Sequence, residues 1–296
     1  MTASSVHGFA VVDKPAGMTS HDVVDRARRL LGTRKVGHAG TLDPDVTGVL
    51  LLGVGNATRL LRFVGELPKT YVGQMVLGVE TTTLDAGGQV TAGHDMAGIT
   101  LAEVRAAAAG LVGHILQVPP MVSAVKIGGR RLHELARAGV EVERPPRPVT
   151  VHRFDVVAES APGVFAVEVA CSSGTYVRSL AADLGRALGG GAILGSLRRT
   201  AVGPWSVAEA VPLDRLALLP VGDAVAHLPA VVVDREVGAL VTTGRRLSRS
   251  GPTVFPGEGP WSVLGEDGGL LAVYEARDSL AVPAVVLPAV PPPADG

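Results

Sequence analysis

The segment from Gly37 to Gly48, GHAGTLDPDVTG, carries the side chain best placed to do chemistry, the carboxylate of Asp43. A proline follows Asp43 and biases its backbone toward extended angles, while the glycines allow positive φ and close approach of other groups. This pattern predicts a rigid loop, neither regular helix nor ordinary strand, that presents one acid. Such a carboxylate can act as a nucleophile or general base. Asp-Pro is also common in ordinary turns, so the pattern alone leaves a purely structural role open.

Strands and helices on both sides of this loop have to position it. The periodicity predicts strands ending at Val12 and over 49–54, 70–79, 149–158, 164–171 and 192–202, and helices over 20–31, from 56, from 101, near 131–138 and over 176–188. Ser20 and Asn56 are predicted N-caps, and Thr100 with Glu103 forms a capping box. These elements indicate an α+β fold with a mixed, mostly antiparallel central sheet flanked by helices.

The composition changes twice along the chain. Residues 119–148 are rich in Pro, Gly and Arg, with a turn at Gly128-Gly129. A second change lies near 220–229, and residues 226–290 predict a small β-rich unit with one helix that begins after Asp234. We therefore expect a main domain over 1–225, a small domain over 226–290 and a disordered tail over 291–296.

The charge of the chain is nearly balanced, but its basic residues are clustered. The formal net charge is −1, with 27 Lys and Arg against 28 Asp and Glu. Residues 26–69 hold eight basic side chains and three acidic ones, and residues 126–153 hold seven and three. Such clusters create local positive fields to which a phosphate backbone responds. They are equally compatible with solvated faces balanced by acids elsewhere.

The single cysteine and the hydropathy pattern limit the cellular setting. Cys171 excludes an internal disulfide or a cysteine-cluster metal site, and its apolar neighbours predict a buried thiol. The N-terminus lacks the basic and apolar regions of a signal peptide, and prolines interrupt the uncharged run 279–294. We therefore expect a cytoplasmic protein without a membrane span.

Six segments, in this order, closely resemble the TruB family of tRNA pseudouridine synthases. They are DKPAGMTSHDVV (13–24), GHAGTLDPDVTG (37–48), KTYVGQMVLG (69–78), PPMVSAVKIGGRRLHELARAG (119–139), CSSGTYVRSLAADLG (171–185) and LRRTAVGPW (197–205). The resemblance covers about residues 8–215. It implies the pseudouridine synthase fold over 1–225, with 119–148 as a mobile RNA-binding arm. More weakly, it implies a PUA-like RNA-binding domain over 226–290.

The resemblance also implies a reaction and its residues. Uridine 55 in the T-loop of tRNA is isomerised to pseudouridine: the bond from N1 to the ribose breaks, the uracil turns, and its C5 bonds to C1′. No cofactor or metal takes part. Asp43 would be the nucleophile, Arg178 its ionic partner, and Tyr71 the aromatic that stacks on the flipped base. The implied substrate-binding residues besides Tyr71 are His38, Tyr176, Leu197, Asp85, Lys14, Arg59, Lys126 and Arg130, the last four as phosphate contacts.

Two other functions stay open at this stage. One is a tRNA-binding folding chaperone whose catalysis is incidental. The other is a glycosidase with an aspartate nucleophile, which needs a second carboxylate about 5–10 Å from Asp43. The favoured prediction is an isomerase that acts as a monomer on the T-arm of tRNA.

Overall fold

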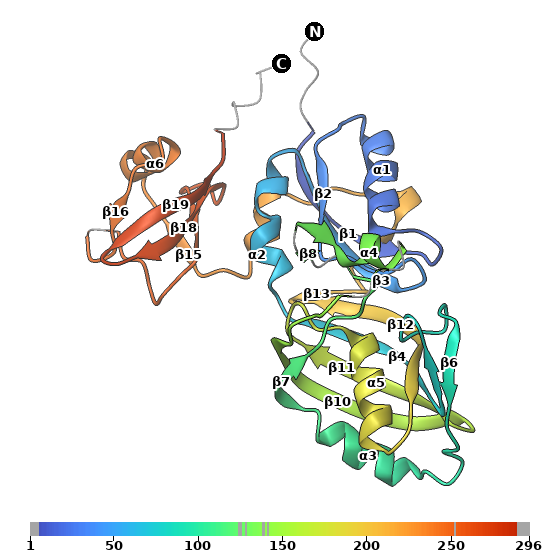
Figure 1. Ribbon diagram of the computed structural model, residues 1–296. Helices are drawn as coiled ribbons and strands as arrows, with labels where there is room; N and C mark the ends of the chain where they lie inside the picture. Colours follow the sequence, from blue (N-terminus) through green and yellow to red (C-terminus); the bar gives the residue numbers. More distant parts are fainter. Residues whose placement is uncertain are drawn as a thin grey trace.

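The computed structural model describes residues 6–123, 126–127, 129–137, 140, 142–251 and 253–288. A ten-stranded sheet runs through the main body (Figure 1). Its main path is β14-β1-β3-β12-β4-β11-β10-β7, with β2 beside β3 and β13 beside β12. The pairs β1–β14 and β3–β12 are parallel, and the other pairs are antiparallel. The predicted α+β class with a mixed, mostly antiparallel sheet is confirmed.

The strands of this sheet have the following bounds. They are β1 (Gly8–Lys14), β2 (Val36–Ala39), β3 (Thr47–Val54), β4 (Lys69–Leu77), β7 (Gly113–Gln117), β10 (Arg147–Ala161), β11 (Val164–Cys171), β12 (Ala192–Val202), β13 (Trp205–Ser206) and β14 (Val211–Pro212). A separate hairpin is formed by β5 (Val79–Thr81) and β6 (Val90–Gly93), and another by β8 (Lys126–Ile127) and β9 (Arg130–Arg131).

The apolar run in β3 is continuous because both faces of this strand are buried. Val49 and Leu51 pack in one cluster with Phe9, whereas Leu50 and Leu52 pack in another with helix α1 (Ser20–Leu31). A strand covered on both faces needs no polar alternation. By contrast, the sheet narrows beside β3: β12 pairs with it at only two positions, Arg198 with Thr47 and Arg199 with Gly48. This short pairing joins two halves of the main body. One half contains β14, β1, β2 and β3, and the other contains β12, β13, β4, β11, β10 and β7.

Helices cover the sheet, and their ends follow the sequence closely. They are α1 (Ser20–Leu31), α2 (Leu61–Gly65), α3 (Leu101–Ala109), α4 (Leu132–Arg137) and α5 (Val177–Ala187), with 3-10 helices η1 (Gly55–Arg59), η2 (Leu213–Arg215) and η3 (Val221–Val225). The capping box of Thr100 and Glu103 is confirmed. Gly32 ends α1 in the left-handed conformation.

Two predicted caps and one predicted loop are wrong. Thr19, not Ser20, caps α1 in a capping box with Asp22, since Ser20 is already helical and its hydroxyl is used elsewhere. Asn56 caps no helix: η1 begins one residue earlier and has no side-chain cap. The segment around His38 was expected to be loop, but Val36–Ala39 pairs with β3 as strand β2.

The C-terminal part forms a second, five-stranded sheet in the order β15-β17-β18-β19-β16. Its elements are β15 (Ala230–Val232), α6 (Arg235–Thr242), β16 (Leu247–Ser248), β17 (Trp261–Leu264), β18 (Leu270–Arg277) and β19 (Leu280–Val286). Asp234 caps α6, so the predicted helix start is confirmed. The predicted small β-rich unit is confirmed as part of the fold, while the domain boundary at 225/226 stays a prediction. The predicted tail 291–296 lies outside the described residues.

Helices η1 and α2 link this second sheet to the main body. Arg62 forms an ion pair with Glu275 at 2.5 Å, and Arg59 donates to the carbonyl of Val286 at 2.5 Å. Figure 1 shows α2 on the side of the main body that faces this unit. In the described part of the chain, no helix is long and apolar enough to cross a membrane.

Candidate active site

A pocket of about 270 Å³ lies where the two halves of the main body meet. Its walls are the loop 40–46, strand β4, the segment 172–176, the start of α5 and strand β12. It brings together Asp43, Tyr71, Tyr176, Arg178 and Leu197, which lie far apart in the sequence. We call it the Asp43 pocket.

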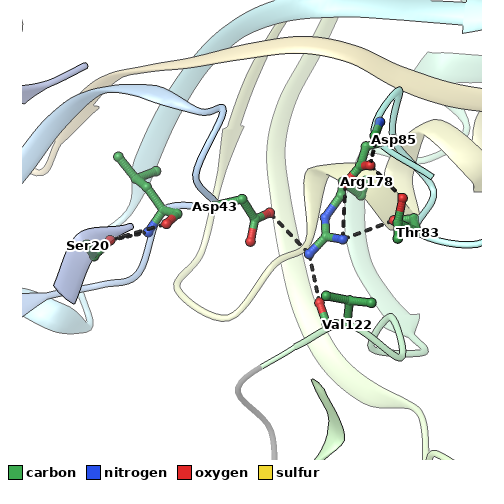
Figure 2. Close-up of polar contacts among 8 residues, drawn as sticks. Ser20, Asp43, Thr83, Asp85, Val122 and Arg178 are labelled. Atoms are coloured by element: carbon green, nitrogen blue, oxygen red, sulfur yellow. Dashed lines mark hydrogen bonds and ion pairs between the residues drawn. The ribbon is translucent and has the colours of Figure 1, made fainter. Parts of the chain in front are cut away.

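Arg178 is the polar centre of this site. Its side chain is 6% exposed, and Nη2 lies 3.1 Å from Asp43 Oδ2. Nη1 lies 3.2 Å from Asp85 Oδ2, so one guanidinium holds two carboxylates. Its remaining contacts are backbone carbonyls, Thr83 O at 3.0 Å from Nη1 and Val122 O at 2.9 Å from Nη2 (Figure 2). The helix periodicity left the direction of Arg178 undecided, and the structure directs it inward.

The loop that carries Asp43 is fixed on both sides of the aspartate. Ser20 Oγ accepts from Leu42 N at 2.8 Å and donates to Leu42 O at 3.2 Å (Figure 2). On the other side, the carbonyl of Pro44 accepts from Lys14 Nζ at 2.8 Å and from Gly17 N at 3.0 Å. The segment 13–24 therefore supports the nucleophile candidate through its backbone.

Lys14 does not fit its predicted role as a phosphate contact. The residue is fully buried, and Nζ donates to three carbonyls, those of Pro15, Met18 and Pro44. These bonds use all three N–H groups of an ammonium. The prediction failed because residues that follow in the chain cover the end of β1, which local sequence does not reveal.

The electrostatics of Asp43 are set by opposing effects. Burial raises the pKa of its carboxyl, and the negative charges of Asp85 and Asp45 act in the same direction. Arg178 and Lys14 lower that pKa but do not cancel the effect of burial. The side chain nevertheless stays 46% exposed, which leaves it accessible to a ligand in the pocket.

Asp85 supports Arg178 from outside the pocket. Its Oδ1 accepts from Thr83 Oγ1 at 2.6 Å and from Gly87 N at 3.1 Å. Leu84, between Thr83 and Asp85, has a φ of 62°, a strained value for a non-glycine residue. The turn is thus held in the shape that directs Asp85 toward Arg178. Among the described lining residues Asp43 is the sole carboxylate, because Asp85, although held by the same guanidinium, does not line the pocket.

Two buried cations in the pocket wall were missed by the sequence reasoning. Arg199 is 1% exposed and donates from Nε to Val49 O at 2.7 Å and from Nη2 to Gly40 O at 3.2 Å. Lys69 is 5% exposed and donates to Gly65 O and Leu67 O, and burial lowers its pKa to about 8. For Arg199, the sequence signal that could have indicated this role was its position within the predicted strand 192–202, where a charged side chain is unusual.

Gly48 allows the close packing that places Arg199. Its φ is 104°, and a Cβ at this position would lie 2.1 Å from the backbone oxygen of Arg199. A side chain would therefore separate β3 from β12 at the place where the halves join.

Tyr71 is 8% exposed, and burial raises the pKa of its hydroxyl above the usual value, which keeps it a neutral phenol.

The remaining predicted residues are not part of the described pocket lining. His38, on β2, is half-buried and not part of the lining, and burial lowers its pKa. Arg59 is exposed beside the second sheet, and Arg130 is exposed on β9. Lys126 falls on β8, but its side chain lies outside the described residues. Their roles in binding stay predictions.

No group of three or more His, Cys, Asp or Glu residues in the described parts of the chain is arranged to hold a metal ion. The charged and aromatic side chains that line the Asp43 pocket are one carboxylate, two phenols and three cations.

Comparison with known proteins identifies the family. Residues 28–177 match the N-terminal domain model of the TruB family pseudouridylate synthases, and residues 178–225 match the tRNA pseudouridylate synthase B C-terminal domain model. The chain belongs to the TruB family. A protein of Arthrobacter sp. (strain FB24) named tRNA pseudouridine synthase B is 45% identical over 293 residues, which are 94% of this chain and 96% of that protein. A protein of the same name from Thermobifida fusca (strain YX) is 47% identical over 291 residues, covering 94% and 98%.

Solved structures extend the likeness to three dimensions. The crystal structure of a Cbf5–Nop10–Gar1 complex contains a chain with a TM-score of 0.74 and 26% identity, covering 95% of this TruB chain and 85% of that one. A chain in the structure of an H/ACA RNP bound to a substrate RNA containing 2′-deoxyuridine gives a TM-score of 0.73 at 25% identity, with the same coverage. The predicted family and pseudouridine synthase fold are confirmed for this TruB protein.

Proposed function

We propose that this protein isomerises uridine 55 in the T-loop of tRNA to pseudouridine, with Asp43 as the nucleophile. The observation that carries the proposal is the ion pair between Asp43 and the buried Arg178 in the wall of an open pocket. The match to tRNA pseudouridine synthases over nearly the whole chain supports both the reaction and the substrate class.

The reaction conserves all atoms and needs no electron acceptor. The bond between N1 of uracil and C1′ breaks, a bond between C5 and C1′ forms, and the proton on C5 is transferred to N1 by way of solvent or a side chain. Asp43 can attack uracil C6, attack C1′ or remove a ribose proton, and the arrangement of side chains leaves these routes open. In each route the ionised carboxylate is the active form, and Arg178 directs it.

A uridine within a folded T-loop must leave its stack to reach Asp43. Tyr71, Tyr176 and Leu197 supply the aromatic and apolar walls against which a flipped uracil can stack. Arg59, Arg130 and Lys126 are the proposed phosphate contacts, which position the RNA without reading its sequence. We also infer that the protein acts as a monomer in the cytoplasm and binds the T-arm.

Substitution of the proposed nucleophile tests the function. Purified Asp43→Asn protein should produce no pseudouridine in T-loop RNA, as mapped by mass spectrometry, while its Kd for tRNA stays within about tenfold of wild type. Asp45→Asn is the matched control, since Asp45 lies two residues away and lines a different groove. Product formation by Asp43→Asn would refute the nucleophile. Rescue of a deletion strain by this variant would favour the RNA-chaperone function instead.

A further inference from the structure

We propose that Gln117 is a positioning residue for the isomerisation, which acts by fixing the start of α5 and thereby the guanidinium of Arg178. This inference rests on the proposed function, because the effect is expected in the chemical step.

Gln117 ends strand β7 and is 2% exposed. Its Oε1 accepts from the backbone N of Tyr176 at 2.7 Å, and its Nε2 donates to the backbone O of Tyr176 at 3.1 Å. The backbone N–H can only donate and the carbonyl can only accept, so the two bonds fix the orientation of the amide. One buried side chain therefore holds both backbone groups of a single residue.

That residue occupies a position that is otherwise uncapped. Tyr176 is the N-cap residue of α5, and its own side chain makes no capping bond. The first turn of α5 thus depends on bonds from elsewhere in the chain. From the end of β7, Gln117 bonds the N–H and the carbonyl of this N-cap residue, as a pair of sheet ladder bonds would.

The chain after Gln117 continues to contact the same helix start. Val118 O accepts from Ser179 Oγ at 3.2 Å, and Val122 O accepts from Arg178 Nη2 at 2.9 Å. Three successive contacts therefore join residues 117–122 to residues 176–179. Among them, the Gln117 amide is the one that bonds the backbone at the N-cap itself.

The position of this helix start matters for chemistry because two of its residues, Tyr176 and Arg178, face the Asp43 pocket. Tyr176 lines the Asp43 pocket, and Arg178, two residues later, contacts Asp43 and Asp85 at 3.1 and 3.2 Å. These contacts are near the limit of good hydrogen-bond geometry, so a small shift of the helix start breaks one of them. A misplacement of about 1 Å can lower a reaction rate about 100-fold while substrate binding persists.

The test uses two substitutions of similar size and different polarity. Gln117→Met keeps the apolar stem and removes both bonds. In Gln117→Glu, a protonated carboxylic acid presents one acceptor and one donor as the amide does. We expect Gln117→Met to lower the single-turnover rate at saturating tRNA by roughly 10- to 100-fold with Kd changed less than about threefold. The rate of Gln117→Glu, relative to wild type at the same pH, should rise as pH falls. Gln89→Met, at an exposed glutamine, serves as the control.

A double substitution separates positioning from a merely structural role. If Gln117 acts through Arg178, Gln117→Met should cost less than about threefold when Arg178 is already Ala, because coupled residues are not additive. Equal losses in both backgrounds, or a loss confined to tRNA affinity, would overturn the inference. If Gln117→Met does not fold, the pH dependence of Gln117→Glu decides. A wild-type protein that makes no pseudouridine would refute the proposed function, whereas an unchanged Gln117→Met rate beside an active wild type would refute only this inference.

Discussion

Replacement of Arg178 by alanine should slow the chemical step far more than it weakens tRNA binding. The substitution removes four contacts at once, to Asp43, Asp85, Thr83 O and Val122 O. Since the side chain of Arg178 is 6% exposed, these contacts are largely shielded from bulk water. Two carboxylates that shared one cation are then left beside each other without it.

The size of the effect follows from the contact to Asp43. A hydrogen bond to a charged group contributes about 1.5–3 kcal/mol. Because Asp43 is 46% exposed, solvent screens part of this energy, and the lower half of the range applies. At about 1.4 kcal/mol for each tenfold change, the single-turnover rate should fall roughly 10- to 40-fold from orientation alone. Loss of the buried cation should also lower the free energy of unfolding by about 3 kcal/mol.

Single-turnover kinetics with excess enzyme measure the chemical step, and filter binding measures tRNA affinity separately. Arg186→Ala is the matched control, because Arg186 lies on the same helix with a side chain that is 70% exposed. It should leave both quantities unchanged. A rate that stays normal at saturating tRNA while Kd rises in proportion would refute our reasoning about Arg178.

Substitution of Asp85 tests the electrostatics of Asp43, and substitution of Lys14 tests whether its buried ammonium contacts phosphate. Since burial raises the pKa of Asp43 and ionised Asp43 is the active form, the rate should fall with decreasing pH at a midpoint above the ordinary 3.8. Asp85→Asn removes a charge that raises the pKa of Asp43, so the midpoint of the pH–rate profile should move to lower pH. A profile with no shift, or with a shift to higher pH, would contradict this electrostatic explanation. Lys14→Met should lower the melting temperature by several degrees but leave the salt dependence of tRNA binding unchanged. Replacement of a predicted phosphate contact such as Arg130 should instead reduce the slope of log Kd against log salt by about 1. A reduced slope for Lys14→Met would restore it as a phosphate contact.

Much of the fold could be predicted because its signals are local. Strand β11 follows the apolar alternation exactly over Val164–Cys171, and Thr100 with Glu103 marks the start of α3. Where neighbouring residues offer the same chemistry, the local signal is less precise. Thr19 and Ser20 both carry a hydroxyl, and the structure uses the first as the helix cap and the second to hold Leu42.

The candidate site was less accessible to sequence reasoning because burial there depends on distant partners. Arg178 stands beside the buried Val177 on α5, and its inward direction follows from carboxylates that other segments supply. The family resemblance indicated the Asp43–Arg178 pair correctly. Neither periodicity nor resemblance indicated Lys69, whose buried ammonium donates to the carbonyls of Gly65, at the end of α2, and of Leu67.

The four contacts of Arg178 come from stretches of chain that are remote in sequence, and this has a consequence for how the protein reaches its working state. Thr83 and Val122 lie 95 and 56 residues from Arg178 along the chain, and the loop of Asp43 is more distant still. Helices and hairpins assemble early because their contacts are local, while such long loops close slowly. Recovery of turnover after denaturation therefore reports the final docking of the two halves. Far-ultraviolet circular dichroism, which follows secondary structure, does not detect this event.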